Sequence, residues 1–240
     1  TADFDINQRD LEANPTILDG ENQRRVLYQY DHFSTSTYSV IDGFTIQNGN
    51  SGSGGGLLLS SNSRFYNCKF INNSTNGQGG AVYTTSPLNN NTLNIFGNCL
   101  FENNSASMGG AIFDINGLTL SGCRFYNNTA TTKGGAYYVF SNKKTKLINC
   151  VFAMNNATDG GAIYNRGQMT MTNCNIVRNE AQNSIGGLYN ESKYSKFYNS
   201  VFWNNTANGE ANQIEGESQL FNCAVEGDYE GTNIIKLSAN

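Results

Sequence analysis

The sequence contains little charge, and this shortage narrows the class of protein. Only 14% of its 240 residues are charged, and Asn, Gly, Ser and Thr supply most of the polarity. This composition argues against long surface helices, which favour Glu, Lys, Arg and Ala. Beyond Lys143, Lys144 and Lys146 there is no basic stripe, and the net charge is −4. We therefore expect no nucleic acid partner.

Several motifs of common enzyme and membrane classes are also missing. No run of about 18 apolar residues is present, so we expect no membrane-spanning helix in this segment, and no signal peptide is recognised. His32 is the only histidine, and no Cys/His metal pair can be assembled around it. There is no GxSxG motif, and the Gly-rich stretch from Gly52 lacks the Lys-Ser/Thr of a phosphate loop. The sequence predicts no metal and no cofactor.

What the sequence does contain is a repeat with a period in the twenties. The repeated motif is Cys, any residue, Phe or Ile, two further residues and then Asn. Successive Cys positions are 31, 24, 27, 24, 26 and 23 residues apart, with Ser200 in the place of one cysteine. The motif residues are Cys68, Cys99, Cys123, Cys150, Cys174 and Cys223, with Asn73, Asn104, Asn128, Asn155, Asn179 and Asn205. Such a period predicts a solenoid.

A second marker keeps step with the cysteines and divides each repeat. Gly pairs such as Gly79-Gly80 and Gly109-Gly110 precede apolar strands such as AVYT and AIFD. In the repeat from Gly109 we predict strands at 111–115, 118–121 and 123–126, each too short for a helix and alternating with period two. We aligned Gly55-Gly56 and Gly186-Gly187 with these pairs. The segment 84–92, with Pro87, is an insertion expected to form a surface loop.

These patterns predict an all-β fold, a right-handed parallel β-helix with three short strands per coil and about eight coils. We expect one domain over 1–240, with irregular first coils in 1–40 and a last partial coil in 226–240. Cys and the following Phe should form interior ladders. Rungs about 4.8 Å apart do not suit disulfides, whose Cβ atoms are closer and turned toward each other. The Asn ladder should lie at a turn, where Asn adopts left-handed conformations and can bond its neighbours along the axis.

The GGA-I-Y strands and F-x-x-N turns resemble those of bacterial right-handed parallel β-helix proteins, including the polymorphic outer-membrane protein repeats of chlamydial type. The opening stretch from Gln8 to Gly20 is similar to the lead-in of large secreted β-helix proteins. The resemblance covers nearly the whole chain. It implies an extracellular or bacterial cell-surface segment of a larger chain or assembly, since such repeats occur in adhesins, surface fibres and exported proteins.

Candidate binding residues come from the strands after the Gly pairs. If the second strand residue, as in Leu58, Val82 and Tyr189, points inward, the third position lies outside. The predicted outer stripe comprises Tyr83, Phe113, Tyr138 and Tyr164, which would suit stacking on sugars or contact with a protein. Trp203, the sole tryptophan, is a further candidate on the strand after the cysteine.

We searched the acidic residues for a catalytic pair, because β-helix folds also host polysaccharide lyases and glycoside hydrolases. Such enzymes need carboxylates in one register on adjacent coils, and Glu102, Asp114 and Glu191 fall at different phases. Asp19 and Asp42 are expected to share a register, in LDG and IDG, and an Asp before Gly suits a tight turn. We therefore expect a non-enzymatic module that binds glycans or proteins, with a carbohydrate-active enzyme as the alternative.

The thiol prediction has a direct test. Alkylation under denaturing conditions without reductant should label all six cysteines, because the ladder keeps them reduced. Mass spectrometry counts the labels, and a reduced sample serves as the control. A lower count in the unreduced sample would show that cysteines are paired and that the ladder is wrong.

Overall fold

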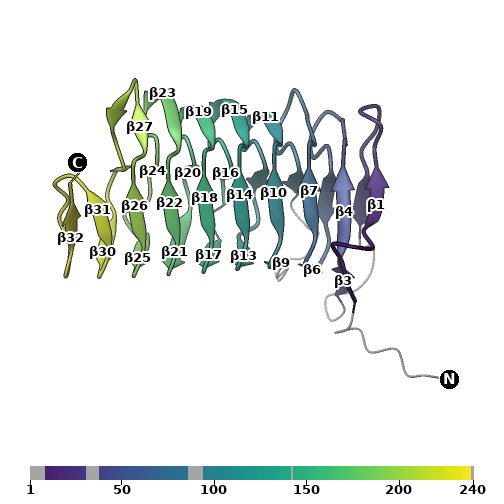
Figure 1. Ribbon diagram of the computed structural model, residues 1–240, viewed down its shortest axis with the longest axis horizontal. Helices are drawn as coiled ribbons and strands as arrows, with labels where there is room; N and C mark the ends of the chain where they lie inside the picture. The colour runs from purple at the N-terminus through teal and green to yellow at the C-terminus, as the bar shows by residue number, and fades with distance from the viewer. Residues whose placement is uncertain (1–8, 31–37, 86–93, 142, 239–240) are drawn as a thin grey trace.

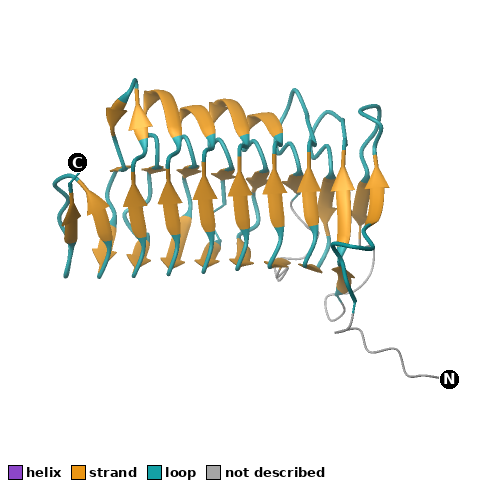
Figure 2. Ribbon diagram, viewed as in Figure 1, coloured by secondary structure: helices purple, strands orange, loops and turns teal. Residues whose placement is uncertain are grey.

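The computed structural model describes residues 9–30, 38–85, 94–141 and 143–238, and these contain strands but no helix (Figure 2). The chain winds as a parallel β-helix from the N-terminal end at the right of Figure 1 to the C-terminal end at the left. Each full coil passes through sheets B, C, A and D in that order. The predicted all-β solenoid with three strands per coil is confirmed, and sheet D is an addition.

The strands of each sheet are stacked along the solenoid axis. Sheet A contains β1 (Thr16–Asp19), β4 (Phe44–Gln47), β7 (Lys69–Ile71), β10 (Leu100–Glu102), β14 (Arg124–Tyr126), β18 (Val151–Ala153), β22 (Asn175–Val177), β26 (Val201–Trp203), β31 (Ala224–Glu226) and β32 (Ile235–Leu237). Sheet B contains β2 (Leu27–Tyr30), β5 (Leu57–Ser60), β8 (Val82–Thr84), β12 (Ile112–Asp114), β16 (Tyr137–Val139), β20 (Ile163–Asn165), β24 (Leu188–Asn190) and β29 (Ile214–Glu215).

The other two sheets complete the coil. Sheet C contains β3 (Ser39–Asp42), β6 (Ser63–Tyr66), β9 (Asn94–Gly97), β13 (Leu118–Ser121), β17 (Lys144–Ile148), β21 (Gln168–Thr172), β25 (Lys196–Tyr198) and β30 (Gln219–Phe221). Sheet D contains β11 (Ser105–Met108), β15 (Thr129–Lys133), β19 (Asn156–Asp159), β23 (Glu180–Ser184), β27 (Thr206–Ala207) and β28 (Glu210–Ala211), the last pair antiparallel.

The core is built from ladders of identical or similar side chains. The middle residues of the sheet A strands, such as Phe101 and Phe125, are fully buried. From Phe70 to Phe152 their rings stack with centroids 4.4 to 4.9 Å apart. Strand alternation puts every second residue on the same face, so one Phe per coil suffices to fill this side of the tube. Each buried ring contributes about 2 kcal/mol of hydrophobic stabilisation.

All six cysteines are free and buried, and their thiols have a hydrogen-bonding role that the sequence did not indicate. The Cys99 thiol donates to the carbonyl oxygens of Gly97 and of Phe65 in the preceding coil. Burial raises the pKa of the Cys99 thiol well above its usual value, so it keeps the proton that it donates. Ser200 replaces a cysteine because its hydroxyl makes the same bond, to the Tyr198 carbonyl.

The Asn ladder lies inside the tube, at the corner where sheet A passes to sheet D. The Asn128 side-chain amide donates to the carbonyl oxygen of Phe101 and to Oδ1 of Asn155. Its own Oδ1 accepts from the backbone and side-chain amides of Asn104. Asn73, Asn104, Asn155 and Asn179 repeat this pattern. The predicted bonding along the axis is therefore present.

The expected backbone conformation of the Asn ladder was wrong by one residue. The left-handed position is the exposed residue before each buried Asn, for example Asn103 and Asn127, with φ of 55° and 52°. This turn directs the next side chain inward, where its amide replaces the hydrogen bonds that a corner interrupts. Residues before the cysteines, such as Asn98 and Asn149, are also left-handed.

The two glycines of a Gly pair are needed for different reasons. The first, as in Gly109 and Gly134, has positive φ. A Cβ on the second, Gly110, would lie 2.1 Å from the Gly135 carbonyl oxygen of the next coil. The strand pairing corrects our alignment in two coils, because Gly54 and Ile185 occupy the first position there. Hence Gly55 and Gly186 are the close-approach glycines.

The C-terminal end of the tube is covered by the chain itself. β32 pairs with β31 after only a short connection, and Tyr229 and Ile234 pack against the core. The Tyr229 hydroxyl accepts from the backbone amides of Gln213 and Ile214 at the edge of sheet B. Most of the insertion 84–92, with Pro87, and His32 lie outside the described residues.

We predict that Asn128→Ala lowers the free energy of unfolding by about 3 kcal/mol, because it leaves the Asn104 amide and the Phe101 carbonyl without partners in the core. Urea unfolding followed by circular dichroism measures the change. Asn127→Gly is the matched control. Asn127 is the exposed, left-handed residue before Asn128, and glycine adopts that conformation without strain. Equal effects of the two substitutions would contradict the role of the buried amide.

Candidate functional site

The predicted aromatic stripe forms a single row on the outer face of sheet B, which we call the outer aromatic row. Strand pairing aligns Tyr83, Phe113, Tyr138 and Tyr164 in register. It also adds Leu58 and Tyr189, which we had placed on the inner face. Both errors come from the two misaligned Gly pairs, since a shift of one residue moves a side chain to the opposite face.

The outer aromatic row is much less accessible than we expected. Phe113, Tyr138 and Tyr164 are only 4 to 6% exposed, although they belong to a cluster separate from the core. Their rings stack on one another with centroids 4.9 and 5.3 Å apart, and Met108 and Ile115 pack against them. Most of the ring surface is therefore occupied by protein. The role of these residues in ligand binding stays a prediction.

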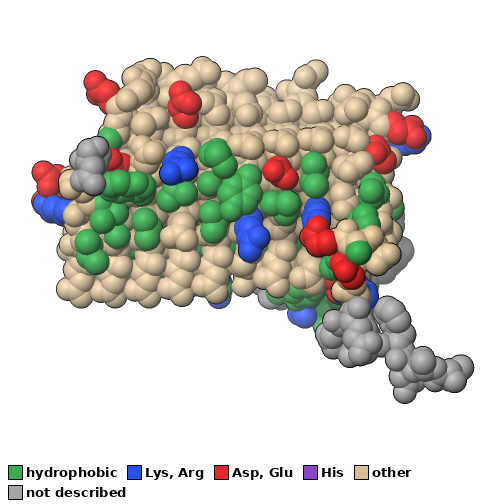
Figure 3. All heavy atoms as spheres, viewed as in Figure 1, with side chains coloured by type: hydrophobic (Ala, Val, Ile, Leu, Met, Phe, Trp, Pro, Cys, Tyr) green, Lys and Arg blue, Asp and Glu red, His purple; other side chains and the backbone are tan. Residues whose placement is uncertain are grey.

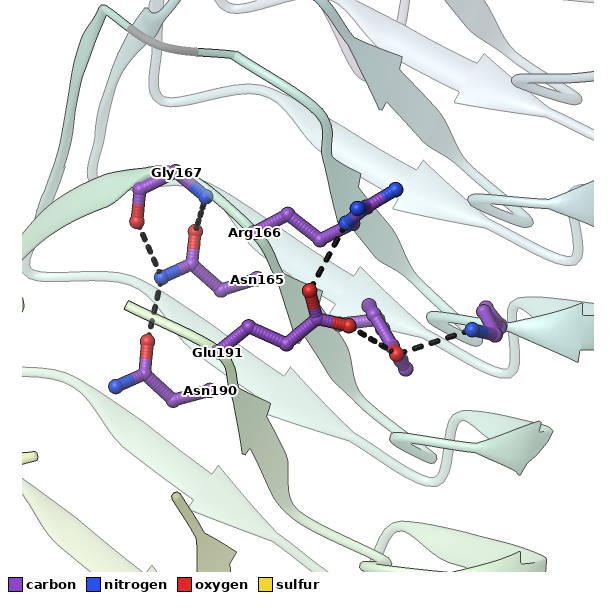
Figure 4. Close-up of polar contacts among 7 residues, drawn as sticks. Asn165, Arg166, Gly167, Asn190 and Glu191 are labelled. Carbon is purple, nitrogen blue, oxygen red and sulfur yellow. Dashed lines mark hydrogen bonds and ion pairs between the residues drawn. The ribbon is translucent and has the colours of Figure 1, made fainter. Parts of the chain in front are cut away.

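A polar cluster lies at the C-terminal part of the outer aromatic row (Figure 4). The Tyr164 hydroxyl donates to Oε1 of Glu191 at 2.5 Å and accepts from Nζ of Lys133 at 3.0 Å. Nε of Arg166 donates to Oε2 of Glu191 at 2.9 Å. Burial and the bond to Glu191 raise the pKa of Tyr164. The phenol therefore keeps its proton near neutral pH.

Buried amides beneath this cluster fix its geometry. The Asn165 side chain donates to Oδ1 of Asn190 at 2.7 Å and to the Gly167 carbonyl, and its Oδ1 accepts from the Gly167 amide (Figure 4). The Asn165 side chain thus holds the turn from Asn165 to Gly167 through two hydrogen bonds. Arg166 and Glu191 each follow a buried Asn at equivalent positions of neighbouring coils. The sequence reasoning missed this ion pair, although opposite charges one period apart are a signal that could have found it.

A shallow groove opens beside the cluster. It encloses about 720 Å³ and its main lining side chains are Arg166, Gln168, Glu191, Lys193, Tyr194 and Glu217. Tyr194 is 60% exposed, and the guanidinium of Arg166 lies 5.0 Å from the ring centre of Phe140, which is half exposed. These rings are more accessible than the buried members of the outer aromatic row.

Trp203 lies on a different face, the outer side of sheet A. Pairing aligns it with Val177, Ala153 and Tyr126 in one outward row. The structure therefore does not bring Trp203 together with Tyr83 and its neighbours. Figure 3 shows hydrophobic side chains gathered in a band over sheet A. The two faces are separate candidates for binding.

Two glutamates, Glu191 and Glu217, line the groove, whereas Asp114, Asp19 and Asp42 are not among its lining residues. Asp114 is completely buried and accepts from Tyr137, Thr84 and the amides of Asn116 and Gly117. Asp19 and Asp42 do not share a register, because Asp19 pairs with Gln47 in sheet A and Asp42 with Tyr66 in sheet C. The two Asp-Gly sequences therefore lie at different corners of the coil.

The described part of the chain contains no group of three or more His, Cys, Asp or Glu side chains that could hold a metal ion. The same residues include no helix with the length and hydrophobicity needed to cross a membrane.

The fold defines the chain as a parallel β-helix repeat protein, and comparisons with known proteins specify the repeat. Residues 67–85 and 98–114 match the Chlamydia polymorphic membrane protein repeat. Over 143 residues, 51% of this chain, the sequence is 33% identical to the probable outer membrane protein pmp20 of Chlamydia pneumoniae, and the match covers 8% of that protein. No solved structure matches the chain.

The chain therefore carries repeats of the polymorphic membrane protein type, which confirms the resemblance drawn from its motifs. Each matched stretch contains the left-handed turn, the buried Cys and the Gly pair of one coil. The comparisons are consistent with a segment of a surface protein and with a bacterial cell-surface location.

The buried Asp114 generates a prediction about pH. Burial raises the pKa of this carboxyl in the folded state. Its contribution to stability is therefore full below the ordinary pKa of about 4 and is lost as the pH rises through the folded-state value. Asn cannot titrate, so the stability of the native chain relative to Asp114→Asn should fall across that range.

Urea unfolding of both proteins over a series of pH values measures this difference. The native chain and the variant share shape and surroundings, so other titrating groups cancel in the subtraction. A relative stability that increases with pH would show that the hydrogen-bond donors around Asp114 outweigh its burial.

Proposed function

We propose that the segment is a rigid, non-enzymatic module of a bacterial surface protein, which binds a glycan or a protein along a side face of the solenoid. The observation that carries the proposal is the outer face of sheet A, where the partly exposed side chains of Trp203, Val177 and Tyr126 are aligned in one row. Exposed apolar strips of this kind are typical of interaction sites.

Rigidity supports the same proposal. Buried amide ladders link successive coils at one corner, and thiol donors link them at another. Each coil is thus held to the next by side-chain as well as backbone hydrogen bonds. A tube of this kind presents side chains at a regular spacing of about 4.8 Å, and a ligand that binds it need not order a flexible surface.

The alternative, a carbohydrate-active enzyme, draws on the cluster of Tyr164, Glu191, Lys133 and Arg166 beside the groove. A lyase of uronic polysaccharides needs a base that takes a proton from the sugar. Tyr164 has a raised pKa and remains protonated, and both oxygens of Glu191 are engaged by Tyr164 and Arg166. This arrangement favours a static support for the groove over proton transfer.

Two assays on the purified chain separate the hypotheses. We expect the folded chain to bind members of a glycan array or the surface of cultured mammalian cells, whereas a heat-denatured sample does not. We also expect no unsaturated product, detected by its ultraviolet absorbance, from uronic polysaccharides.

Variants sharpen the second assay. Glu191→Gln removes a charge from the cluster, and Glu215→Gln removes one from an exposed position at the end of sheet B. Product formation that is lost in Glu191→Gln but kept in Glu215→Gln would overturn the non-enzymatic proposal. Failure of the native chain to bind any glycan or cell would overturn the binding module itself.

A further inference from the structure

The outer face of sheet A has a composition that specifies its ligand more closely. From β14 to β26 its outward residues include Tyr126, Val151, Val177, Val201 and Trp203. We call these residues the apolar strip. Their inward neighbours, Phe125 to Phe202, fill the core, so the strip cannot turn inward. Figure 3 shows the corresponding band of hydrophobic side chains, with Lys and Arg side chains beside it.

Exposed residues in left-handed turns border the apolar strip at both edges of sheet A; most are Asn, but Met154 and Arg178 occupy two of these positions at the edge toward sheet D. Asn adopts this backbone conformation readily, which explains why it is used there. The side-chain amides of these asparagines have no hydrogen-bond partner in the described part of the chain; they are Asn103, Asn127 and Asn204 at one edge and Asn149, Asn173 and Asn199 at the other. An amide both donates and accepts, so these side chains match the hydroxyl groups of a sugar chain.

Two aromatic side chains of the strip are separated by smaller residues. Tyr126 and Trp203 are in one outward row with Ala153 and Val177 between them. The two rings are three rungs apart, a span of about 14 Å. The space between them is long enough for an oligosaccharide, and aromatic rings pack well on the apolar faces of pyranoses.

This face carries charges of both signs, since Glu12 and Glu102 line one groove with Arg124 and Tyr126. Arg124 and Arg178 are exposed next to the strip, and neither belongs to an ion pair within the described residues. Glu226, at the end of the strip, is buried and accepts from the Gln213 side chain and from the backbone amide of Asn204. Glu102, beside Tyr126, is the carboxylate at the other end.

From these contacts we infer that the outer face of sheet A binds a linear acidic polysaccharide, whose carboxylate or sulfate groups contact Arg124 and Arg178. Guanidinium groups bind both kinds of anion through paired hydrogen bonds. Tyr126 and Trp203 stack on the sugar rings, and the asparagine amides bond the hydroxyl groups. This inference rests on the proposed function and assigns it a site and a ligand class.

The test uses surface-immobilised heparin, which carries both anions, and polygalacturonate, which carries carboxylates alone. We expect the native chain to bind at least one of them and to bind a neutral β-glucan much more weakly. The double variant Arg124→Gln/Arg178→Gln should bind about tenfold more weakly or worse, because two charge-assisted contacts are lost. The preference between the two probes tells sulfate from carboxylate.

Lys146→Gln/Lys196→Gln is the matched control. It removes the same charge from two exposed positions of sheet C that are both aligned with Thr170, and we expect it to keep native affinity. Trp203→Ala should weaken binding to the acidic probe while leaving the dependence on salt unchanged. Circular dichroism confirms that each variant is folded.

Three outcomes overturn this inference. The first is equal loss in the two double variants, which would indicate unspecific attraction between charges. The second is binding of neutral glucan as strong as that of the acidic probes. The third is binding to cells that persists after enzymatic removal of their acidic glycans, which identifies a protein partner and leaves the proposed function intact.

Discussion

The hydrogen bonds of the buried Asn ladder are the constraint on which the rest of this structure depends. A solenoid must turn a corner several times per coil, and each corner interrupts the backbone pairing between coils. At the corner between sheets A and D, the side chain of Asn128 bonds the coils on both sides. It bonds Asn104 and the Phe101 carbonyl of the coil before it, and it donates to Oδ1 of Asn155 in the coil after it. An unpaired amide here would cost the full desolvation penalty, so the ladder holds all coils in one register.

That register determines what the outer faces present. Because strands alternate, the buried Phe of each sheet A strand obliges its neighbours, such as Val201 and Trp203, to face outward. The left-handed residues that precede the buried positions are exposed by the same geometry, and they are mostly Asn. The apolar strip and its amide borders are therefore consequences of the way the core is built. What distinguishes one coil from another on this face is the choice of Arg124, Val151 or Asn175 at equivalent positions.

Much of the fold followed from spacing alone, and the failures have a common cause. The Cys and Asn positions identified the coils because each must meet the same residue one coil away. The Gly pairs were misassigned where three small residues occur together, at Gly54 to Gly56, and where Ile185 takes the place of a glycine. Sheet D escaped prediction because its strands, such as Ser105 to Met108, consist of small and polar residues and their register is irregular.

The sequence by itself determined the period, the parallel stacking and the interior ladders, because identical residues repeated at a fixed spacing can be buried only against their own copies. Only the tertiary structure decided how accessible each outer residue is. Tyr138 and Trp203 both point away from the core, but Tyr138 is enclosed by stacked rings, Met108 and Ile115, whereas Trp203 is partly exposed on sheet A. The physical reason is that accessibility depends on neighbours from several coils and on the corner beside the strand, and no single repeat contains that information.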